Sequence, residues 1–282
     1  MDGVVFIDKE AGVTSRYVDN QIAKRFGTKK VGHLGTLDPF ATGLLILAVG
    51  KATKFLPYID DSKKSYLASL KLGVSSSTGD PEGQLRPSEK PLREIGDAQI
   101  AAVLKTFLGK HRQIPPMASA IKIDGTPLYK LERSGEEIER KPRDIEVFDI
   151  CLLRHEADHF DFVCTVSKGT YIRTLGEDIA KSLGTVGYLT ALRRLSIGPW
   201  QLRHAHSLAA LDEHSLIDPT ILVSAMKHVE VDAAVAAKAK SGIALPFDAA
   251  LGAKILLCQH SVAIAVYALN PDGLYHSERG LF

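Results

Sequence analysis

Residues 32–49 read GHLGTLDPFATGLLILAV and combine a glycine-rich loop with an uninterrupted apolar run. The glycines and Pro39 predict a loop from Gly32 to Gly43, because both residue types favour turns over regular elements. The run from Leu44 to Val49 is typical of a buried central strand. The stretch therefore predicts a stiff loop that leads directly into the interior of a sheet.

The segments around this stretch predict strands and helices without a steady strand–helix–strand rhythm. Expected strands cover residues 4–7, 65–72, 145–153, 160–166 and 193–197, and expected helices cover residues 15–26, 97–107 and 170–183. Residues 75–90 are polar and rich in turn formers, so we expect a loop there. This order of elements favours an α+β fold with a largely antiparallel sheet.

The C-terminal part of the chain has a different character. After Trp200, an Ala-rich helix over residues 231–240 and two apolar strands near 255–258 and 262–268 predict a small unit of mixed or β type. A chain of 282 residues has room for one large and one small domain. We expect the large domain over residues 1–205, and linker helices with the small domain over residues 206–282.

The charge is unevenly distributed along the chain. The formal net charge is +2, residues 201–282 have a balance of −2, and residues 1–200 carry +4. Residues 110–143 form a basic stretch interrupted by proline and glycine. A polyanion is therefore expected to bind mainly within the first two thirds of the chain.

Composition argues against a secreted or membrane protein. The three cysteines, Cys151, Cys164 and Cys258, are far apart and form no disulfide or zinc pattern. No basic stretch precedes an apolar core at the N-terminus, and the longest apolar run is too short to cross a bilayer. We expect a cytoplasmic protein, a monomer without a membrane partner.

Asp38 is the first candidate for chemistry. The glycine-rich loop and Pro39 could hold this carboxylate exposed at the start of a buried strand, as a nucleophile or an acid–base group requires. From the local sequence alone the commoner alternative is an aspartate that only shapes a turn. The local sequence therefore leaves both roles open.

Other polar side chains extend the candidate site. Arg173 lies near a helix start, where a cation is slightly unfavourable, so a fixed anion such as a phosphate or Asp38 would explain it. The alternative is an arginine whose head simply reaches solvent. Tyr66 and Tyr171 offer rings on which a base could stack, or could be ordinary core or edge residues. Arg193 and Arg194 could meet phosphates or form a charged edge. No metal is expected, because the close pair His204 and His206 has no further ligands nearby.

Seven stretches in order along residues 3–200 resemble the motifs of the TruB family, the bacterial tRNA pseudouridine synthases. They are residues 8–15 (DKEAGVTS), 32–43 (GHLGTLDPFATG), 64–66 (KSY), 78–83 (TGDPEG), 113–120 (QIPPMASA) with Lys122, Gly125 and Tyr129, 168–173 (KGTYIR) and 192–195 (LRRL). Glu10 stands where the family usually has proline, and Ser77 where it commonly has aspartate. Both departures lie outside the reacting positions.

The resemblance implies a fold and a reaction. It implies an antiparallel-sheet catalytic domain with an RNA-gripping insert at about residues 84–143, and a small C-terminal PUA-like domain. It also implies isomerisation of uridine 55 in the T-loop of tRNA to pseudouridine, without cofactor or metal. A base inside a folded RNA must leave its stack to be reached, so the site needs a pocket and a stacking platform.

The resemblance also implies roles for single residues. Asp38 is the catalytic carboxylate, Tyr66 stacks on the uracil and assists proton removal, and Arg173 pairs with Asp38 and keeps it ionised by lowering its pKa. His33 supports the displaced RNA loop, Tyr171 and Leu192 line the base pocket, and Arg194 also binds substrate. Lys122, Arg143 and Arg193 are the candidate RNA contacts.

Two further functions are compatible with the sequence. One is an RNA-binding or tRNA-folding module in which catalysis is secondary or lost, and the matched site residues argue against loss. The other is a guide-RNA-directed synthase of the related archaeal and eukaryotic type. The insert argues against this second alternative, because it looks like the RNA grip of the stand-alone enzymes.

Overall fold

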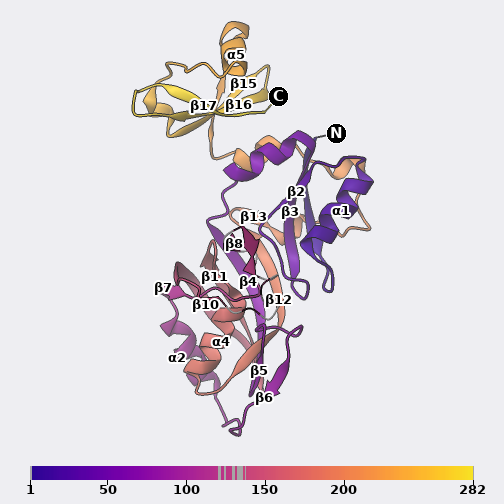
Figure 1. Cartoon of the computed structure of the whole chain (residues 1–282), viewed down its shortest axis with the longest axis vertical. Coiled ribbons are helices and arrows are strands. Elements are labelled where there is room, and N and C mark those ends of the chain that lie inside the picture. Colours follow the sequence, from indigo (N-terminus) through magenta and orange to yellow (C-terminus); the bar gives the residue numbers. More distant parts are fainter. Residues whose placement is uncertain are drawn as a thin grey trace.

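The structure is a computed structural model and describes residues 2–119, 122–123, 125–128, 131, 136 and 138–281. An elongated body built on one large sheet fills most of the length of the molecule, and a smaller sheet lies at one end (Figure 1). No helix among the described residues is both long enough and apolar enough to cross a membrane.

The large sheet follows the order β1-β3-β12-β4-β11-β10-β7 in the described residues, with β2 beside β3 and β13 beside β12. Its strands are β1 (Gly3–Lys9), β2 (Val31–Leu34), β3 (Thr42–Val49), β4 (Lys63–Leu72), β7 (Gly109–Gln113), β10 (Arg143–Glu156), β11 (His159–Ser167), β12 (Gly187–Ile197) and β13 (Trp200–Gln201). Among the described pairings of this sheet, only that of β3 with β12 is parallel. The expected α+β class with a largely antiparallel sheet is confirmed.

Apolar periodicity explains how helices cover this sheet. Helix α1 (Ser15–Arg25) packs Val18 and Ile22 against one face of β1 and β3. The 3₁₀ helix η1 (Gly50–Tyr58) covers the other face of the same strands. Helices α2 (Asp97–Thr106) and α4 (Ile172–Ser182) pack against β4, β10 and β11 and form the largest core.

Several elements differ from the sequence expectation. The expected loop 32–43 contains the end of β2, whose glycine and histidine give no strand pattern. The expected loop 75–90 contains most of a short hairpin of β5 (Val74–Ser76) and β6 (Leu85–Pro87), in which β6 is the exposed strand. Strand β12 starts six residues before the expected strand, because irregular pairing between Leu189 and Ala191 interrupts its alternation.

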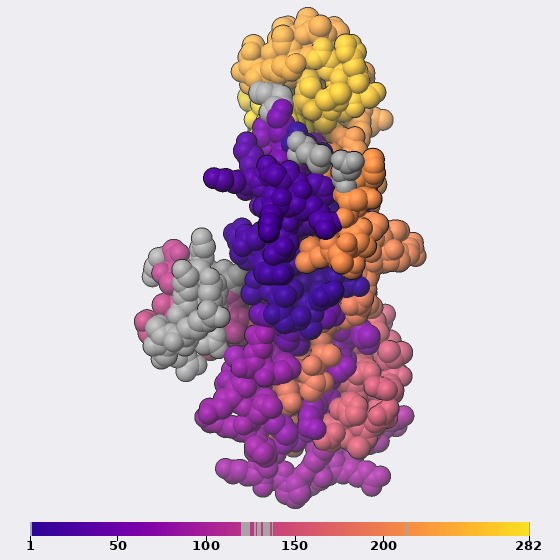
Figure 2. Space-filling model, turned by 90° about the vertical axis from the view of Figure 1, so that its right-hand side faces the viewer, coloured from indigo at the N-terminus to yellow at the C-terminus, as the bar shows by residue number. Residues whose placement is uncertain are grey.

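The region expected as an insert divides into two parts. Residues 97–113, which we counted with the insert, form α2 and β7 and belong to the large sheet and its core. The described residues after Gln113 leave the sheet and include the small hairpin of β8 (Lys122–Ile123) and β9 (Thr126–Pro127). In Figure 2 the described residues of this segment, drawn in pink, project to one side of the N-terminal segment, drawn in indigo.

The C-terminal unit is a four-stranded sheet with one helix over it. The described strands follow the order β14 (Lys227–Glu230), β15 (Lys254–Gln259), β16 (Val262–Leu269) and β17 (Tyr275–Gly280). Helix α5 (Ala233–Lys240) packs Ala236 and Ala239 into its core. The helix and the two central strands were expected, whereas β14 and β17 are too polar to be recognised as strands.

Two contacts tie the C-terminal part to the body. The segment that follows β13 returns to β1, because His206 and Ile217 form bridges with Ile7 and Val4. Phe55 of η1 packs with Leu256 and Val266 of the small sheet in a shared apolar cluster. The small sheet is thus in direct contact with the body.

We expect Gly43→Ala to lower the free energy of unfolding by about 2–4 kcal/mol, because two costs add at this position. Gly43 has a φ of +100°, and a Cβ there would collide with the backbone of Arg194 in β12. Gly27→Ala is the control, since Gly27 also has a positive φ but no atoms crowd a Cβ. Thermal unfolding followed by circular dichroism should show a clearly larger loss of stability for Gly43→Ala than for Gly27→Ala. Equal losses of stability would contradict the role of the close approach between Gly43 and the backbone of Arg194.

Candidate active site

The loop that carries Asp38 connects β2 to β3 and is held from two sides. The hydroxyl of Ser15, in the first turn of α1, donates to the carbonyl of Leu37 (3.1 Å) and accepts from the Leu37 amide (2.9 Å). The Ala41 amide donates to the Asp38 carbonyl (3.1 Å) and closes the turn. The backbone on both sides of Asp38 is therefore fixed.

Two buried cations lie beneath the loop. The Lys9 ammonium donates to the carbonyls of Glu10, Val13 and Pro39. Burial lowers the pKa of Lys9 to about 8, although the charge of Asp38 acts in the opposite direction. Arg194 donates to the carbonyls of Gly35 (2.8 Å) and Leu44 (2.7 Å), one on each side of Asp38.

Arg173 joins Asp38 to a second carboxylate. Its Nε lies 2.9 Å from Asp38 Oδ2, and its Nη1 lies 3.1 Å from Asp80 Oδ2. The guanidinium also donates to the carbonyls of Thr78 (2.8 Å) and Ala118 (2.6 Å). The side chain of Arg173 is 4% exposed and that of Asp38 is 35% exposed, so only the carboxylate can be reached from outside.

The pKa of Asp38 corrects one expectation. We expected the guanidinium to lower it, but burial raises the pKa of Asp38 above its usual value. Arg173 and Lys9 act in the opposite direction and only partly offset the burial, while Asp80 adds to the rise. The site therefore holds a carboxylate that is a stronger base than a solvated aspartate.

Asp80 is the site residue that sequence reasoning missed. It is buried in the loop after β5, where Thr78 donates to its Oδ1 at 2.6 Å and the Glu82 amide donates to the same atom at 3.0 Å. These bonds fix the carboxylate that orients Arg173. An acid between Gly79 and Pro81, inside a stretch that resembles a family motif, was the signal that could have identified it.

The structure brings the two expected tyrosines close to Asp38. Burial raises the pKa of Tyr66 and of Tyr171, and the charge of Asp38 contributes to both rises. Tyr66 lies on β4 and is almost fully buried, with Arg194 hydrogen-bonded to its phenol. Tyr171 precedes α4 and is half-buried, and the Gln113 side chain bonds both its amide (2.8 Å) and its carbonyl (3.0 Å).

Leu192 and His33 contact the loop at Thr42 and at Thr36, which follow and precede Asp38 in the sequence. Leu192 is buried on β12, and its carbonyl accepts from the Thr42 hydroxyl at 3.5 Å. His33 on β2 contacts Asp19 through Nδ1 and Thr36 through Nε2. Both residues therefore border the segment that carries Asp38.

The neighbouring arginines have partners within the protein. Arg194 is 1% exposed, and its guanidinium donates to the carbonyl of Gly35 and to the phenol of Tyr66. The Arg193 guanidinium bonds the Asp8 carboxylate at 2.6 and 3.0 Å, and both side chains remain partly exposed. The sequence could not reveal these contacts, because Gly35 and Tyr66 lie far from Arg194 along the chain, and Asp8 lies far from Arg193.

The two remaining RNA-contact candidates lie near the projecting segment. Arg143 is exposed at the start of β10, where it pairs with Gln113. Lys122 lies in β8, and its side chain is outside the described part of the structure. Neither side chain is shown to touch the Asp38 group.

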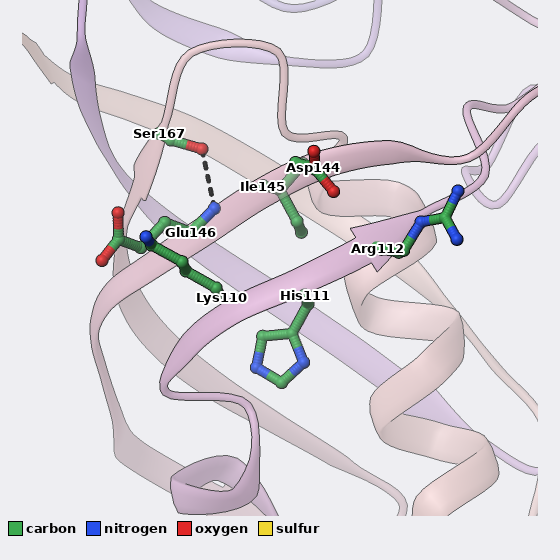
Figure 3. Close-up of a pocket in the computed structure, with 7 residues that line it drawn as sticks. All are labelled: Lys110, His111, Arg112, Asp144, Ile145, Glu146 and Ser167. Atoms are coloured by element: carbon green, nitrogen blue, oxygen red, sulfur yellow. Dashed lines mark hydrogen bonds between the residues drawn. The ribbon is translucent and has the colours of Figure 1, made fainter.

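A cavity of about 450 Å³ lies along the outer strands β7 and β10 (Figure 3). It is lined by Lys110, His111, Arg112, Asp144, Ile145, Glu146 and Ser167. Lys110 faces Glu146 and Arg112 faces Asp144 across the two strands. These cross-strand pairs of opposite charge stabilise the sheet edge and leave little net charge for a ligand.

The described part of the chain contains no group of three or more His, Cys, Asp or Glu side chains that could hold a metal ion. The chemistry of the Asp38 group comes from a basic carboxylate, a fixed guanidinium and two phenols. This combination can activate a nucleophile or remove a proton beside an aromatic ring.

Comparison with known proteins identifies relatives of this chain. The family model for the N-terminal domain of TruB family pseudouridylate synthases matches residues 23–172. The tRNA pseudouridine synthase B of Syntrophotalea carbinolica is 44% identical over 225 residues, covering 79% of this chain and 73% of that protein. That of Geobacter sulfurreducens is 46% identical over 213 residues, covering 76% of this chain and 70% of that protein.

Solved structures share the fold. A chain of a Cbf5-Nop10-Gar1 complex matches with a TM-score of 0.73 and 22% identity, over 99% of this chain and 85% of that chain. A chain of an H/ACA RNP bound to a substrate RNA containing 2'-deoxyuridine gives 0.71 and 21%, over 99% and 85%. The family match and the identity to the bacterial enzymes confirm the resemblance seen in the motifs. The chain belongs to the TruB family of pseudouridylate synthases.

Proposed function

We propose that this protein isomerises uridine 55 in the T-loop of tRNA to pseudouridine, with Asp38 as its catalytic carboxylate. The observation that carries the proposal is the ion pair between Asp38 and buried Arg173, which leaves a reachable, basic carboxylate beside two tyrosines. Curated relatives named tRNA pseudouridine synthase B support tRNA as the substrate.

The reaction conserves every atom of the uridine. The bond from C1′ of the ribose to N1 of the base breaks, the uracil rotates, and a bond from C1′ to C5 forms. A proton leaves C5 and a proton is added at N1, so no oxidant, reductant or second substrate is consumed. The proposed activity therefore requires no cofactor.

Asp38 acts while the glycosidic bond is broken and remade. It adds to the base, bonds to C1′, or removes a proton from the sugar. Each of these steps requires the ionised carboxylate, and a raised pKa makes that carboxylate a better base or nucleophile. Arg173 has a positioning role, because Asp80 and two carbonyls fix the guanidinium that orients Asp38.

The aromatic and apolar residues around Asp38 form the proposed base pocket. A flipped uridine needs a stacking surface and walls that exclude water. We assign the stacking surface to Tyr66, which also assists removal of the C5 proton, and the walls to Tyr171 and Leu192. His33 supports the RNA loop from which the base has been displaced.

The charge pattern supports tRNA as the polyanion. Residues 24–54 contain six Lys/Arg against one Asp/Glu, so they are more basic than the segment 110–143 that we first singled out. Lys24, Arg25, Lys29, Lys30 and Lys51 are exposed, and the Lys30 carbonyl accepts from Gly50 at 2.7 Å, which brings the last two lysines together. Strand β3 separates this basic edge from Asp38 by roughly 25 Å, a distance that a tRNA arm spans easily.

Domain roles are part of the proposal. We assign catalysis to residues 1–205 and assign residues 206–282 to a linker and a small PUA-like domain. The grip on RNA is assigned to the segment after Gln113, because the residues before it are part of the sheet. The protein works as a cytoplasmic monomer, and without a guide RNA because this grip can hold the T-stem-loop directly.

We expect Asp38→Asn to reduce pseudouridine formation by about 10³-fold or more, because the amide cannot act as a base or nucleophile. Binding of tRNA should survive. Mass-spectrometric mapping of pseudouridine in tRNA measures the first effect and filter binding the second. Asp158→Asn, which breaks a half-exposed ion pair with Lys71, is the matched control and should leave turnover unchanged. Normal turnover by Asp38→Asn would contradict the assignment.

The activity should fall with acid at a pH above the usual range of aspartate. A raised pKa in the folded enzyme means that Asp38 is protonated, and thus inactive, at pH values where a solvated aspartate near pKa 3.9 is still ionised. Single-turnover rates measured from pH 4 to 8, with circular dichroism at each pH to exclude unfolding, test this expectation. A rate that stays constant down to about pH 4 would contradict it.

The basic edge should contribute to the salt dependence of tRNA binding. Each phosphate contact adds about 0.7–0.9 to the slope of log K against log salt, so a triple Lys29→Ala/Lys30→Ala/Lys51→Ala variant should lower the slope by up to about 2–3. Lys122→Ala/Arg143→Ala should lower it by up to about 2. Lys105→Ala/Lys181→Ala, with exposed lysines on α2 and α4, is the control. If the slope of log K against log salt is unchanged in a variant, the side chains altered in it belong to a solvated face and do not contact phosphates.

A further inference from the structure

Asp19 is a buried carboxylate that the proposed mechanism does not use. It lies on the inner face of α1 beside Val18 and is 2% exposed. An aspartate is almost never buried to this extent unless a partner compensates its charge and its hydrogen-bonding capacity. Its partners therefore indicate why it is there.

The main partner is His33. Its Nδ1 lies 2.9 Å from Asp19 Oδ1 and 3.0 Å from Asp19 Oδ2, and the imidazole is 16% exposed. Arg16 also reaches Oδ2 at 3.2 Å, but its side chain is 74% exposed, so solvent screens its charge. The imidazole is thus the less exposed of the two partners of Asp19.

This contact determines how the ring is oriented. A carboxylate that carries no proton only accepts hydrogen bonds, so Nδ1 is a ring nitrogen that carries a proton, and in the neutral imidazole Nε2 is then the acceptor. A flip of the ring would replace the N–H by a C–H against the carboxylate. The Nε2 edge consequently points to the Thr36 hydroxyl, 3.1 Å away in the loop that carries Asp38.

A second residue of helix α1, Ser15, contacts the same loop. Ser15 lies four positions before Asp19, on the same side of the helix, and bonds both backbone groups of Leu37. One turn of α1 therefore holds the loop backbone, and the next turn holds the histidine beside it.

We infer that Asp19 is a positioning residue that fixes the orientation and the Nδ1–H tautomer of His33, so that Nε2 and the Thr36 hydroxyl present one preset hydrogen-bonding edge to the displaced RNA loop. The part concerning RNA rests on the proposed function. The part concerning the tautomer stands on the geometry alone. The cost of ordering the ring is then met during folding rather than during RNA binding.

Nuclear magnetic resonance tests the tautomer without any RNA. In protein labelled with ¹⁵N-histidine, the His33 signals are identified by their loss in His33→Ala. We expect the Nδ1–H tautomer in the wild type and in Asp19→Asn, whose amide oxygen still accepts the bond. Asp19→Leu, which has no acceptor, should shift His33 towards the Nε2–H form. An unchanged tautomer in folded Asp19→Leu would overturn the inference.

A double-mutant cycle tests the link to catalysis. Asp19→Leu should lower the single-turnover rate of pseudouridine formation about tenfold to a hundredfold, the range expected when a charge-assisted hydrogen bond is lost. Asp19→Asn should lower this rate by a smaller factor. In a His33→Ala background, Asp19→Leu should have little further effect, since residues that act through one another are not additive.

The outcomes separate the two proposals. If Asp19→Leu lowers the rate equally with and without His33, its role is structural and the inference is wrong. If the tautomer shifts but the wild type forms no pseudouridine, the proposed function fails while the positioning of His33 by Asp19 stands. Thermal unfolding of each variant, followed by circular dichroism, ensures that only folded protein is compared.

Discussion

The close crossing of β3 and β12 is the constraint on which the rest of the structure depends. Thr42 and Gly43 pair in parallel with Arg193 and Arg194, and this junction joins β1, β2 and β3 to the remaining strands of the large sheet. Gly43 permits the approach because it has no Cβ. Arg194 then returns its side chain to the carbonyls on either side of Asp38. The contact that completes the sheet therefore also shapes the loop that carries the carboxylate.

Around that junction the protein gathers four buried charged side chains and the partly exposed Asp38. Lys9, Arg173 and Arg194 surround Asp38 and Asp80, and each cation is bonded to carbonyls or carboxylates. Burying a charge is costly unless it is paired and hydrogen-bonded, so loss of one member leaves its partners uncompensated. The group acts as a unit that keeps Asp38 ionisable while burial raises its pKa.

Much of the fold could be predicted from the sequence, because the relevant signals are local. The apolar run after Gly43, the alternation over residues 65–72 and the helical spacing of Val18 and Ile22 each recur at a period that one segment reveals. The strands that were missed include β2, β5, β6, β14 and β17, which are short or polar, so their pairing depends on the strands beside them. Local periodicity carries no information about such neighbours.

The sequence by itself determined the family and the α+β class, and it predicted Asp38 as the candidate carboxylate, because ordered motifs and apolar periods occur along the chain. The tertiary structure alone decided the partners. It showed that Asp80 fixes Arg173, that Arg194 supports the loop, and that Asp19 holds His33. These contacts join positions 93, 159 and 14 residues apart. Burial, which sets the pKa of Asp38, likewise exists only after the chain has folded.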